Sequence, residues 1–148
     1  MRIWDVPPSL LCRQHLLGEH RELHGLWRIL TENRQGYSHH PETRRWRGKL
    51  AALYQRHEAL TEEMAHRGYR HASPLDQRQA TGSAVQNDYV DPLDAQFVIL
   101  RNKGCDCAVA NDEQNRSSRC KQGRTELGML LKETPSTETL ASPSVTPP

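Results

Sequence analysis

The chain has 148 residues, 35% of them hydrophobic, so we expect one domain with a small core and not several domains. No apolar run approaches the roughly 20 residues of a membrane span, and the first residues are too polar to open a signal peptide. This predicts a cytoplasmic protein that does not enter a membrane. Residues 1–80 hold 13 Lys and Arg against 9 Asp and Glu, and all 8 His lie within the first 71 residues. The basic half suits a face that meets phosphates, although an ordinary soluble surface has a similar balance.

A first helix is predicted over residues 9–32. Pro7-Pro8 ends an extended arm and Ser9 suits the N-cap, whereas Asn33-Arg34-Gln35-Gly36 favours a turn. Between these signals, apolar residues recur at helical spacing on one side of the helix: Leu16, Leu23, Trp27 and Leu30.

A second long helix is predicted over residues 41–67 and a shorter third over 92–103. Pro41 suits a first turn, Gly68 suits the position after a helix end, and Asp91 suits a cap. The apolar stripe of the second helix consists of Leu50, Leu53, His57, Leu60 and Met64. No segment alternates as a strand does, so the predicted fold is all-α, a small domain built on two long helices and a shorter third.

Residues 1–107 are expected to form this helical domain, and residues 108–148 a disordered tail. The last 14 residues are rich in Pro, Ser and Thr and carry one charge, at Glu138. Such a composition buries too little apolar surface to fold.

The four cysteines are expected to be reduced thiols, because the chain shows no secretion signal. Cys105-Asp106-Cys107 is similar to one of the cysteine pairs that bind a structural metal ion, and Cys120 could supply a third ligand. Structural zinc sites, however, usually pair cysteines spaced by two to four residues, and no His follows His71 to complete a local set. We therefore predict neither a metal site nor a cofactor.

His15, Gly18, Glu22 and Gly25 form a second stripe of the first helix, next to its apolar stripe. Glycine inside a helix costs about 1 kcal/mol relative to Ala, so the glycines that flank Glu22 suggest that something approaches this face closely. The N-terminal arm and a ligand are both candidates. Close helix packing, or chance, is the alternative explanation.

Two ungapped segments of the chain resemble one known family. The first contains Arg2-Ile3, Gln14-His15-Leu16 and Glu19-His20-Arg21-Glu22-Leu23. The second runs from Lys49-Leu50 through Leu53, Arg56, Leu60 and Glu63 to Arg67-Gly68-Tyr69. Both resemble the phage pyrimidine-dimer-specific endonuclease V and its bacterial relatives, and the matched parts cover roughly half of the chain.

The resemblance implies a DNA glycosylase with coupled AP lyase activity, without metal or cofactor, that acts as a monomer on damaged double-stranded DNA. In this family the N-terminal α-amine attacks C1′ of the damaged nucleotide and forms a Schiff base. Arg2 is bulky and should block removal of Met1, so the expected nucleophile is the α-amine of Met1 itself. An α-amine ordinarily has a pKa of about 7.7–8.0, against about 10.4 for Lys, so part of it is neutral near pH 7. Glu22 matches the catalytic carboxylate, which would stabilise a cationic transition state and move protons.

The expected DNA contacts fall into two groups. Arg2, His15 and Arg21 match family positions that hold the phosphates around the lesion. A basic strip with Trp46 in its midst is suited to phosphates and base stacking. This strip consists of Arg44, Arg45, Arg47 and Lys49. The chain departs from the family at Gly25, where relatives have Arg, and in its tail, which lacks the aromatic residues of the phage protein. The lesion therefore stays open between a dimer, another damaged base and an abasic site.

Two other functions are compatible with the sequence. A DNA-binding or repair-accessory module would keep the fold and lack the activity. A helical metal-binding protein would use His15/Glu19 and His20/His24, which have the i,i+4 spacing of ligands, together with His39-His40. His20 lies about 140° from His15 around the helix, so the two pairs are not expected to share an ion.

Overall fold

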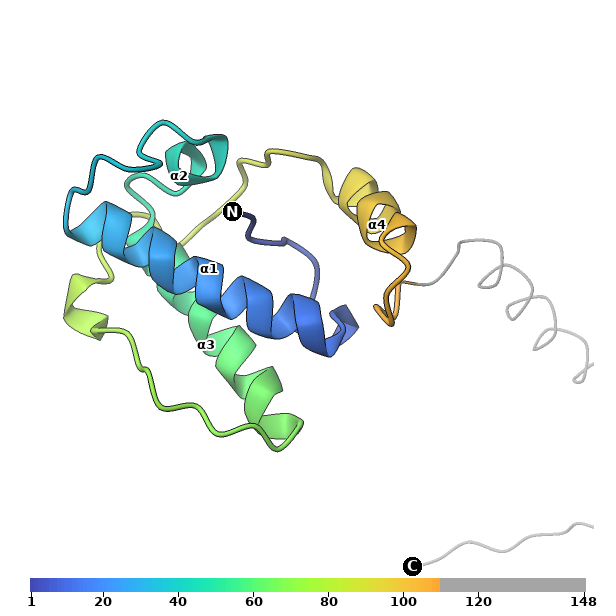
Figure 1. Ribbon diagram of the computed structural model, residues 1–148. Coiled ribbons are helices and arrows are strands. Elements are labelled where there is room, and N and C mark those ends of the chain that lie inside the picture. The colour runs from blue at the N-terminus through green and yellow to red at the C-terminus, as the bar shows by residue number, and fades with distance from the viewer. Residues whose placement is uncertain (110–148) are drawn as a thin grey trace, which may run out of the picture. The chain divides into compact units, whose positions relative to one another are not determined.

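A computed structural model of the chain describes residues 1–109, and this part is helical (Figure 1). Its elements are η1 (Pro8–Leu10), α1 (Arg13–Thr31), α2 (Pro41–Arg45), α3 (Leu50–His66), η2 (Gln77–Gln79) and α4 (Leu93–Asn102), where η denotes a short 3-10 helix. The described residues form no strand, only an isolated antiparallel bridge between Lys49 and Gly82. The predicted all-α fold is confirmed. No helix in residues 1–109 is long and apolar enough to cross a membrane.

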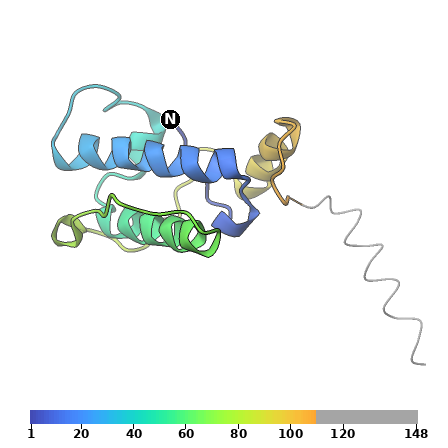
Figure 2. The same cartoon turned by 60° about the horizontal axis from the view of Figure 1, so that its bottom comes forward.

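The core lies between α1 and α3, which pack side by side (Figures 1 and 2). The buried apolar side chains of the two helices are Leu16, Leu23, Leu26, Trp27, Ala52, Leu53, Leu60 and Met64. The predicted stripes are therefore confirmed in their centres, whereas Leu30 and Leu50 at their ends are only partly buried. Each fully buried Leu contributes roughly 1.5–3 kcal/mol of transfer free energy.

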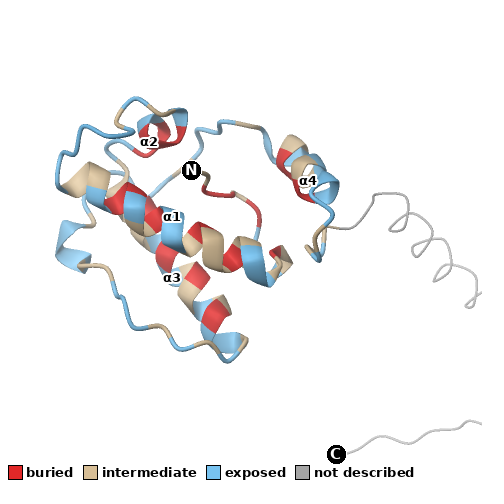
Figure 3. Ribbon diagram, viewed as in Figure 1, coloured by how far each residue is buried: buried red, intermediate tan, exposed pale blue. Residues whose placement is uncertain are grey.

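The arm of residues 1–7 adds a strip of buried residues to this core (Figure 3). Ile3, Trp4 and Val6 are all buried. The predicted start of the first helix at residue 9 was wrong, because Pro8–Leu10 form a separate 3-10 turn and α1 begins at Arg13. Leu11 is extended and buried between them, and its carbonyl accepts a hydrogen bond from Nη1 of Arg67 at 2.8 Å.

The predicted helix over 41–67 is divided into α2 and α3, which corrects the sequence prediction. Gly48 has φ +72°, a left-handed conformation that breaks the helix. The first turn of α3 then finds partners far along the chain: the amide of Ala51 donates to Thr81 at 2.9 Å, and that of Ala52 to Ser83 at 3.1 Å. A Cβ on Gly82 would lie 2.1 Å from the carbonyl oxygen of Gly48, so the two backbones meet where only glycine fits.

The third predicted helix is confirmed within one residue at each end as α4, but its cap differs. Pro92 occupies the N-cap, and Asp91 instead pairs with Arg2 at 2.7 Å. Buried Gln96 joins α4 to the arm: it accepts from the amide of Asp5 at 2.9 Å and donates to the Asp5 carboxylate at 2.8 Å. Residues 110–148 lie outside the described part, and with them most of the expected tail and Cys120. The boundary at residue 107 stays a prediction.

Candidate active site and nucleic-acid interface

The N-terminal arm brings Met1 to the middle of α1. Trp4 contacts the ring of His15 edge-on at 5.8 Å between centroids, and its backbone amide bonds to the buried carboxylate of Glu19. Farther along, the amide of Ile3 donates to Glu42 of α2 at 3.2 Å. The arm therefore runs back along α1, and in both views its first residue lies beside the middle of that helix (Figures 1 and 2). Met1 is half-buried there.

Glu22 is the central residue of α1, and it is exposed between two glycines. Buried Leu23 fixes the rotation of the helix, so that Glu22 faces away from the core. A Cβ on Gly18 or on Gly25 would meet no atom within 4 Å. No atom of residues 1–109 therefore packs against either glycine, which excludes close packing of the arm or of another helix as the reason for them. A ligand from outside the described chain, or chance, remains.

The two arginines expected near Glu22 differ in their contacts. Arg21 is exposed. Arg2 pairs with Asp91 and lies over the ring of Trp4, 4.9 Å from its centroid. The side chains of Arg2 and Asp91 are both about one-third exposed, and such pairs contribute roughly 0–1 kcal/mol. A phosphate can therefore replace Asp91 at small cost.

The structure buries one residue of the predicted basic strip, Arg45, and exposes two others, Arg44 and Arg47. Arg45 is buried, and all five of its donor hydrogens have partners: Asp5, Glu42, Asp88 O and Ile3 O. Burial lowers the pKa of the guanidinium, but the carboxylates of Asp5 and Glu42 outweigh it and raise that pKa. No donor is left for a phosphate, so we remove Arg45 from the expected DNA contacts and assign it to the fold.

Trp46 was also expected at a DNA surface, and that expectation was wrong. Its ring is buried, and its Nε1 donates to Glu42 at 3.3 Å. Of the remaining basic residues of the strip, Arg44 and Arg47 are exposed, and Arg47 donates to Ser38 O at 2.8 Å. Lys49 is largely covered and bonded to Gln86 and Asp88.

A buried ion pair that sequence reasoning missed fixes the arm against both long helices. The guanidinium of Arg56 on α3 donates two hydrogen bonds to the carboxylate of Glu19 on α1, at 2.7 and 3.0 Å. It also donates to Val6 O at 3.0 Å. Burial raises the pKa of Glu19 to about 7, although Arg56 opposes the shift. Arg56 was noted only as part of the family match, and no local pattern in the sequence pairs it with Glu19.

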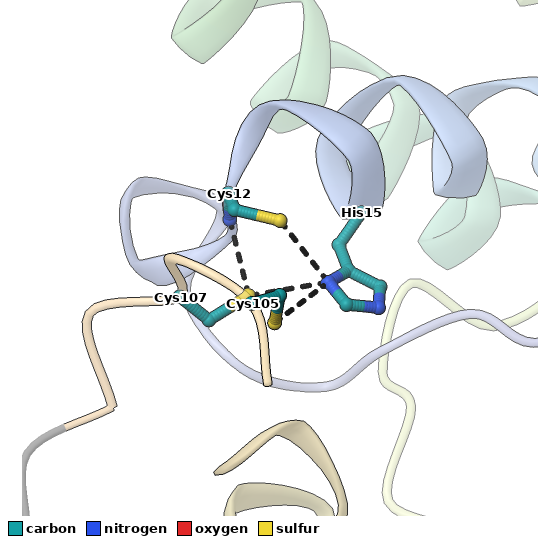
Figure 4. A group of neighbouring side chains, drawn as sticks. All are labelled: Cys12, His15, Cys105 and Cys107. Carbon is teal, nitrogen blue, oxygen red and sulfur yellow. Dashed lines mark hydrogen bonds between the residues drawn. The ribbon is translucent and has the colours of Figure 1, made fainter. Parts of the chain in front are cut away.

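His15 does not share the open face of Glu22. Its Nδ1 lies 3.2 Å from the sulfurs of Cys12 and Cys107 and 3.5 Å from that of Cys105 (Figure 4). Burial, and then the charge of Lys103, lower the pKa of its imidazole. The sequence prediction grouped His15 with Glu22 because a helical wheel shows only which residues share a side of one helix. It gives no information about Cys105, which is 90 residues away in the sequence.

The i,i+4 pairs of the metal-protein alternative separate as expected. His20 and His24 face each other, with 3.2 Å between their Nε2 atoms, and His15 lies elsewhere. Glu19, the supposed partner of His15, is taken by Arg56. His40 accepts a bond from the amide of Glu42 and so caps α2.

Comparisons with known proteins agree with the resemblance. The family model described as pyrimidine dimer DNA glycosylase matches residues 1–77, which is just over half of the chain and includes the arm, Glu22 and all of α1 to α3. No curated protein and no solved structure matches the chain.

Proposed function

The chain belongs to the pyrimidine dimer DNA glycosylase family, a family of DNA repair, and from this membership we propose that it cleaves damaged DNA as a glycosylase with coupled AP lyase activity. The nucleophile is the α-amine of Met1, and Glu22 is the catalytic carboxylate. The observation that carries the proposal is the open, glycine-flanked face of Glu22 beside the N-terminal arm.

The proposed reaction has two stages. The neutral amine of Met1 attacks C1′ of the damaged nucleotide, the bond from C1′ to the base breaks, and the base leaves with a proton. Opening of the sugar ring then gives an imine between C1′ and the amine. Loss of a proton from C2′ expels the 3′ phosphate by β-elimination, and water releases the enzyme. Glu22 stabilises the positive charge that develops on the sugar and relays the protons, which a carboxylate with solvent access on an uncrowded face can do.

The proposed partner is double-stranded DNA with a pyrimidine dimer or related damage. We propose Arg2 and Arg21 as contacts to the phosphates around the lesion, as in the family, with Arg44, Arg47 and Lys49 as contacts farther along the backbone. His15 is not among them, because it packs against Cys12 and Cys107 away from the face of Glu22. This assignment is supported by the contact between the N-terminal arm and α2. Glu42 and Arg45 of α2 both form hydrogen bonds with the backbone of Ile3, next to Arg2. The cytoplasmic monomer expected from the sequence stays a prediction.

A trapping experiment tests this function. The full chain is incubated with duplex DNA carrying an abasic site or a UV-induced dimer, and borohydride is added to reduce any imine to a stable adduct. We expect a covalent adduct with the wild type, and none after chemical blocking of the N-terminal amine. Glu22→Gln should lower the yield of cleaved DNA, and Glu62→Gln, an exposed glutamate of α3, serves as its control. DNA binding without an adduct would refute catalysis and support a repair-accessory module.

A further inference from the structure

Three cysteines and one histidine meet at the start of α1 (Figure 4). Cys12 is the N-cap of α1 and His15 lies in its first turn, whereas Cys105 and Cys107 come from the segment after α4. The three sulfurs and the Nδ1 atom of His15 all lie within 4.8 Å of one another. Cys12, Cys105 and Cys107 are free thiols, so no disulfide explains the gathering.

Hydrogen bonding does not explain the gathering either. All three sulfurs approach the same atom, Nδ1 of His15, at 3.2, 3.2 and 3.5 Å. A ring nitrogen carries one hydrogen or one lone pair, so it makes one good hydrogen bond and not three. An ion at the centre would satisfy all four atoms at once.

We propose that Cys12, His15, Cys105 and Cys107 bind a structural zinc ion. With arms of about 2.3 Å to sulfur and about 2.0–2.1 Å to nitrogen, tetrahedral zinc holds sulfur and nitrogen ligands about 3.6 Å apart, close to the observed spacing. Three thiolates and one imidazole are a common zinc ligand set. In addition, the amide of Cys12 donates to the sulfur of Cys107 at 3.1 Å, a bond that stabilises a thiolate ligand.

The position of the site indicates a structural and not a catalytic ion. The protein supplies all four ligands, which leaves no place for a substrate or a reactive water. Cys105 and Cys107 lie beyond the residues that the family model matches, so the ion ties this added segment to α1. The bond from the amide of Ala108 to Leu10 O, 2.8 Å, joins the same segment to η1, just before α1. His15 is also in contact with Trp4, so the ion indirectly supports the arm that carries Met1.

Metal analysis of the full chain, purified without chelator, tests the site. We expect bound zinc, and after exchange for Co²⁺ the visible bands of tetrahedral cobalt with intense thiolate-to-metal charge transfer. Cys105→Ser and Cys107→Ser should remove the charge-transfer absorption or shift it strongly, and Cys120→Ser should leave it unchanged. A wild type whose Co²⁺ spectrum lacks thiolate charge transfer would overturn the proposal even if the variants fail to fold. So would an unchanged spectrum in Cys107→Ser.

Four histidines form a separate cluster on the other side of α1. His20 and His24 come from α1, His57 from α3 and His71 from the chain after α3, and one ring nitrogen from each lies within 4.8 Å of the others. The ring centroid of His57 lies 5.2, 5.1 and 5.1 Å from the ring centroids of His20, His24 and His71, respectively. The i,i+4 pair noticed in the sequence is half of this cluster.

His57 is the residue that demands an explanation. It is fully buried, and its Nδ1 donates to Glu58 at 2.9 Å, so its Nε2 carries the lone pair. Among residues 1–109 no atom meets that Nε2 at hydrogen-bonding geometry, although the backbone of Ser73 acts on the ring, and an unsatisfied buried polar atom costs about 1–3 kcal/mol. A carboxylate bonded to the far nitrogen of an imidazole is the usual support of a metal-bound histidine.

From this second observation we infer that His20, His24, His57 and His71 bind a divalent transition metal ion such as Zn²⁺ or Ni²⁺. Imidazole ligands suit both ions and bind in the neutral form. Burial, together with the neighbouring imidazoles, lowers the pKa of His20 to about 4, and burial lowers the pKa of His24 and of His57. These three shifts favour the neutral imidazole, which is the form that binds a metal ion.

Titration of the metal-free chain with Co²⁺ separates the two sites. We expect one equivalent bound with thiolate charge transfer and a second bound without it. His20→Gln combined with His24→Gln should remove only the second equivalent, whereas His66→Gln, an exposed histidine of α3, should remove neither. Uptake of a single equivalent by the wild type, or of two by the double variant, would overturn the second site.

Discussion

Replacing Gly18 or Gly25 with Ala is expected to stabilise the protein, and at Gly18 also to impair its action on DNA. Gly25 has a helical backbone, is exposed in the interior of α1, and its Cβ would meet no atom within 4 Å. Nothing in residues 1–109 therefore offsets the gain of about 1 kcal/mol that Ala brings to a helix interior. In a domain of about 100 residues this gain raises Tm by roughly 4–8 °C. Gly18→Ala, one turn before Glu22, should act in the same direction.

At Gly18 the effect on activity has the opposite sign, because a DNA backbone that reaches Glu22 must pass over this glycine, whereas relatives carry Arg at the position of Gly25. We expect the yield of borohydride-trapped adduct to fall in Gly18→Ala, while Gly25→Ala and Gly36→Ala, the latter in the exposed loop after α1, leave it unchanged. Thermal unfolding followed by circular dichroism and quantitative trapping on abasic duplex DNA provide the two measurements. A lower Tm would show that the face is not open. A higher Tm with unchanged trapping in Gly18→Ala would show that DNA does not approach it.

Three further predictions follow from the buried and exposed charges. Arg45→Ala should lower the free energy of unfolding in urea by about 3–5 kcal/mol, because it leaves the buried carboxylates of Asp5 and Glu42 without a cation; a change below 1 kcal/mol would contradict the buried network. Arg44→Ala, on the exposed side of α2, should leave stability within about 0.5 kcal/mol and reduce the slope of log affinity against log salt by about 0.9, as measured by DNA anisotropy; an unchanged slope would remove Arg44 from the interface. Glu22→Gln should leave Tm unchanged while strand cleavage falls, and a large loss of Tm would mean that Glu22 serves the fold.

The spacing of apolar residues was sufficient to predict α1 and α3, the two helices that pack against each other. The stripes centred on Leu23 and Leu60 predict α1 and α3, because each helix buries one face and the spacing of apolar residues reports that face directly. The gap between α2 and α3 could not be predicted in this way. It depends on residues 81–83, which bind the first amides of α3 and bring Gly82 against Gly48.

The same distinction applies to the sites. The side of α1 on which Glu22 lies could be predicted because a helical wheel separates it from the apolar stripe of the same helix. The resemblance to the family then suggests a catalytic role for it. The cysteine cluster could not be predicted, because its halves, Cys12 with His15 and Cys105 with Cys107, are about 90 residues apart and neither half has the spacing of a complete zinc motif. Arg45 and Arg44 are adjacent and chemically identical, and only the fold makes one structural and the other exposed.

Mapping the trapped adduct tests the central claim most directly. The reduced complex of the full chain with abasic duplex DNA is digested, and the modified peptide is identified by mass spectrometry. We predict that the sugar remnant is attached to the α-amine of Met1. Attachment to the ε-amine of Lys49 or Lys103 would contradict the N-terminal nucleophile even if the protein is an active lyase.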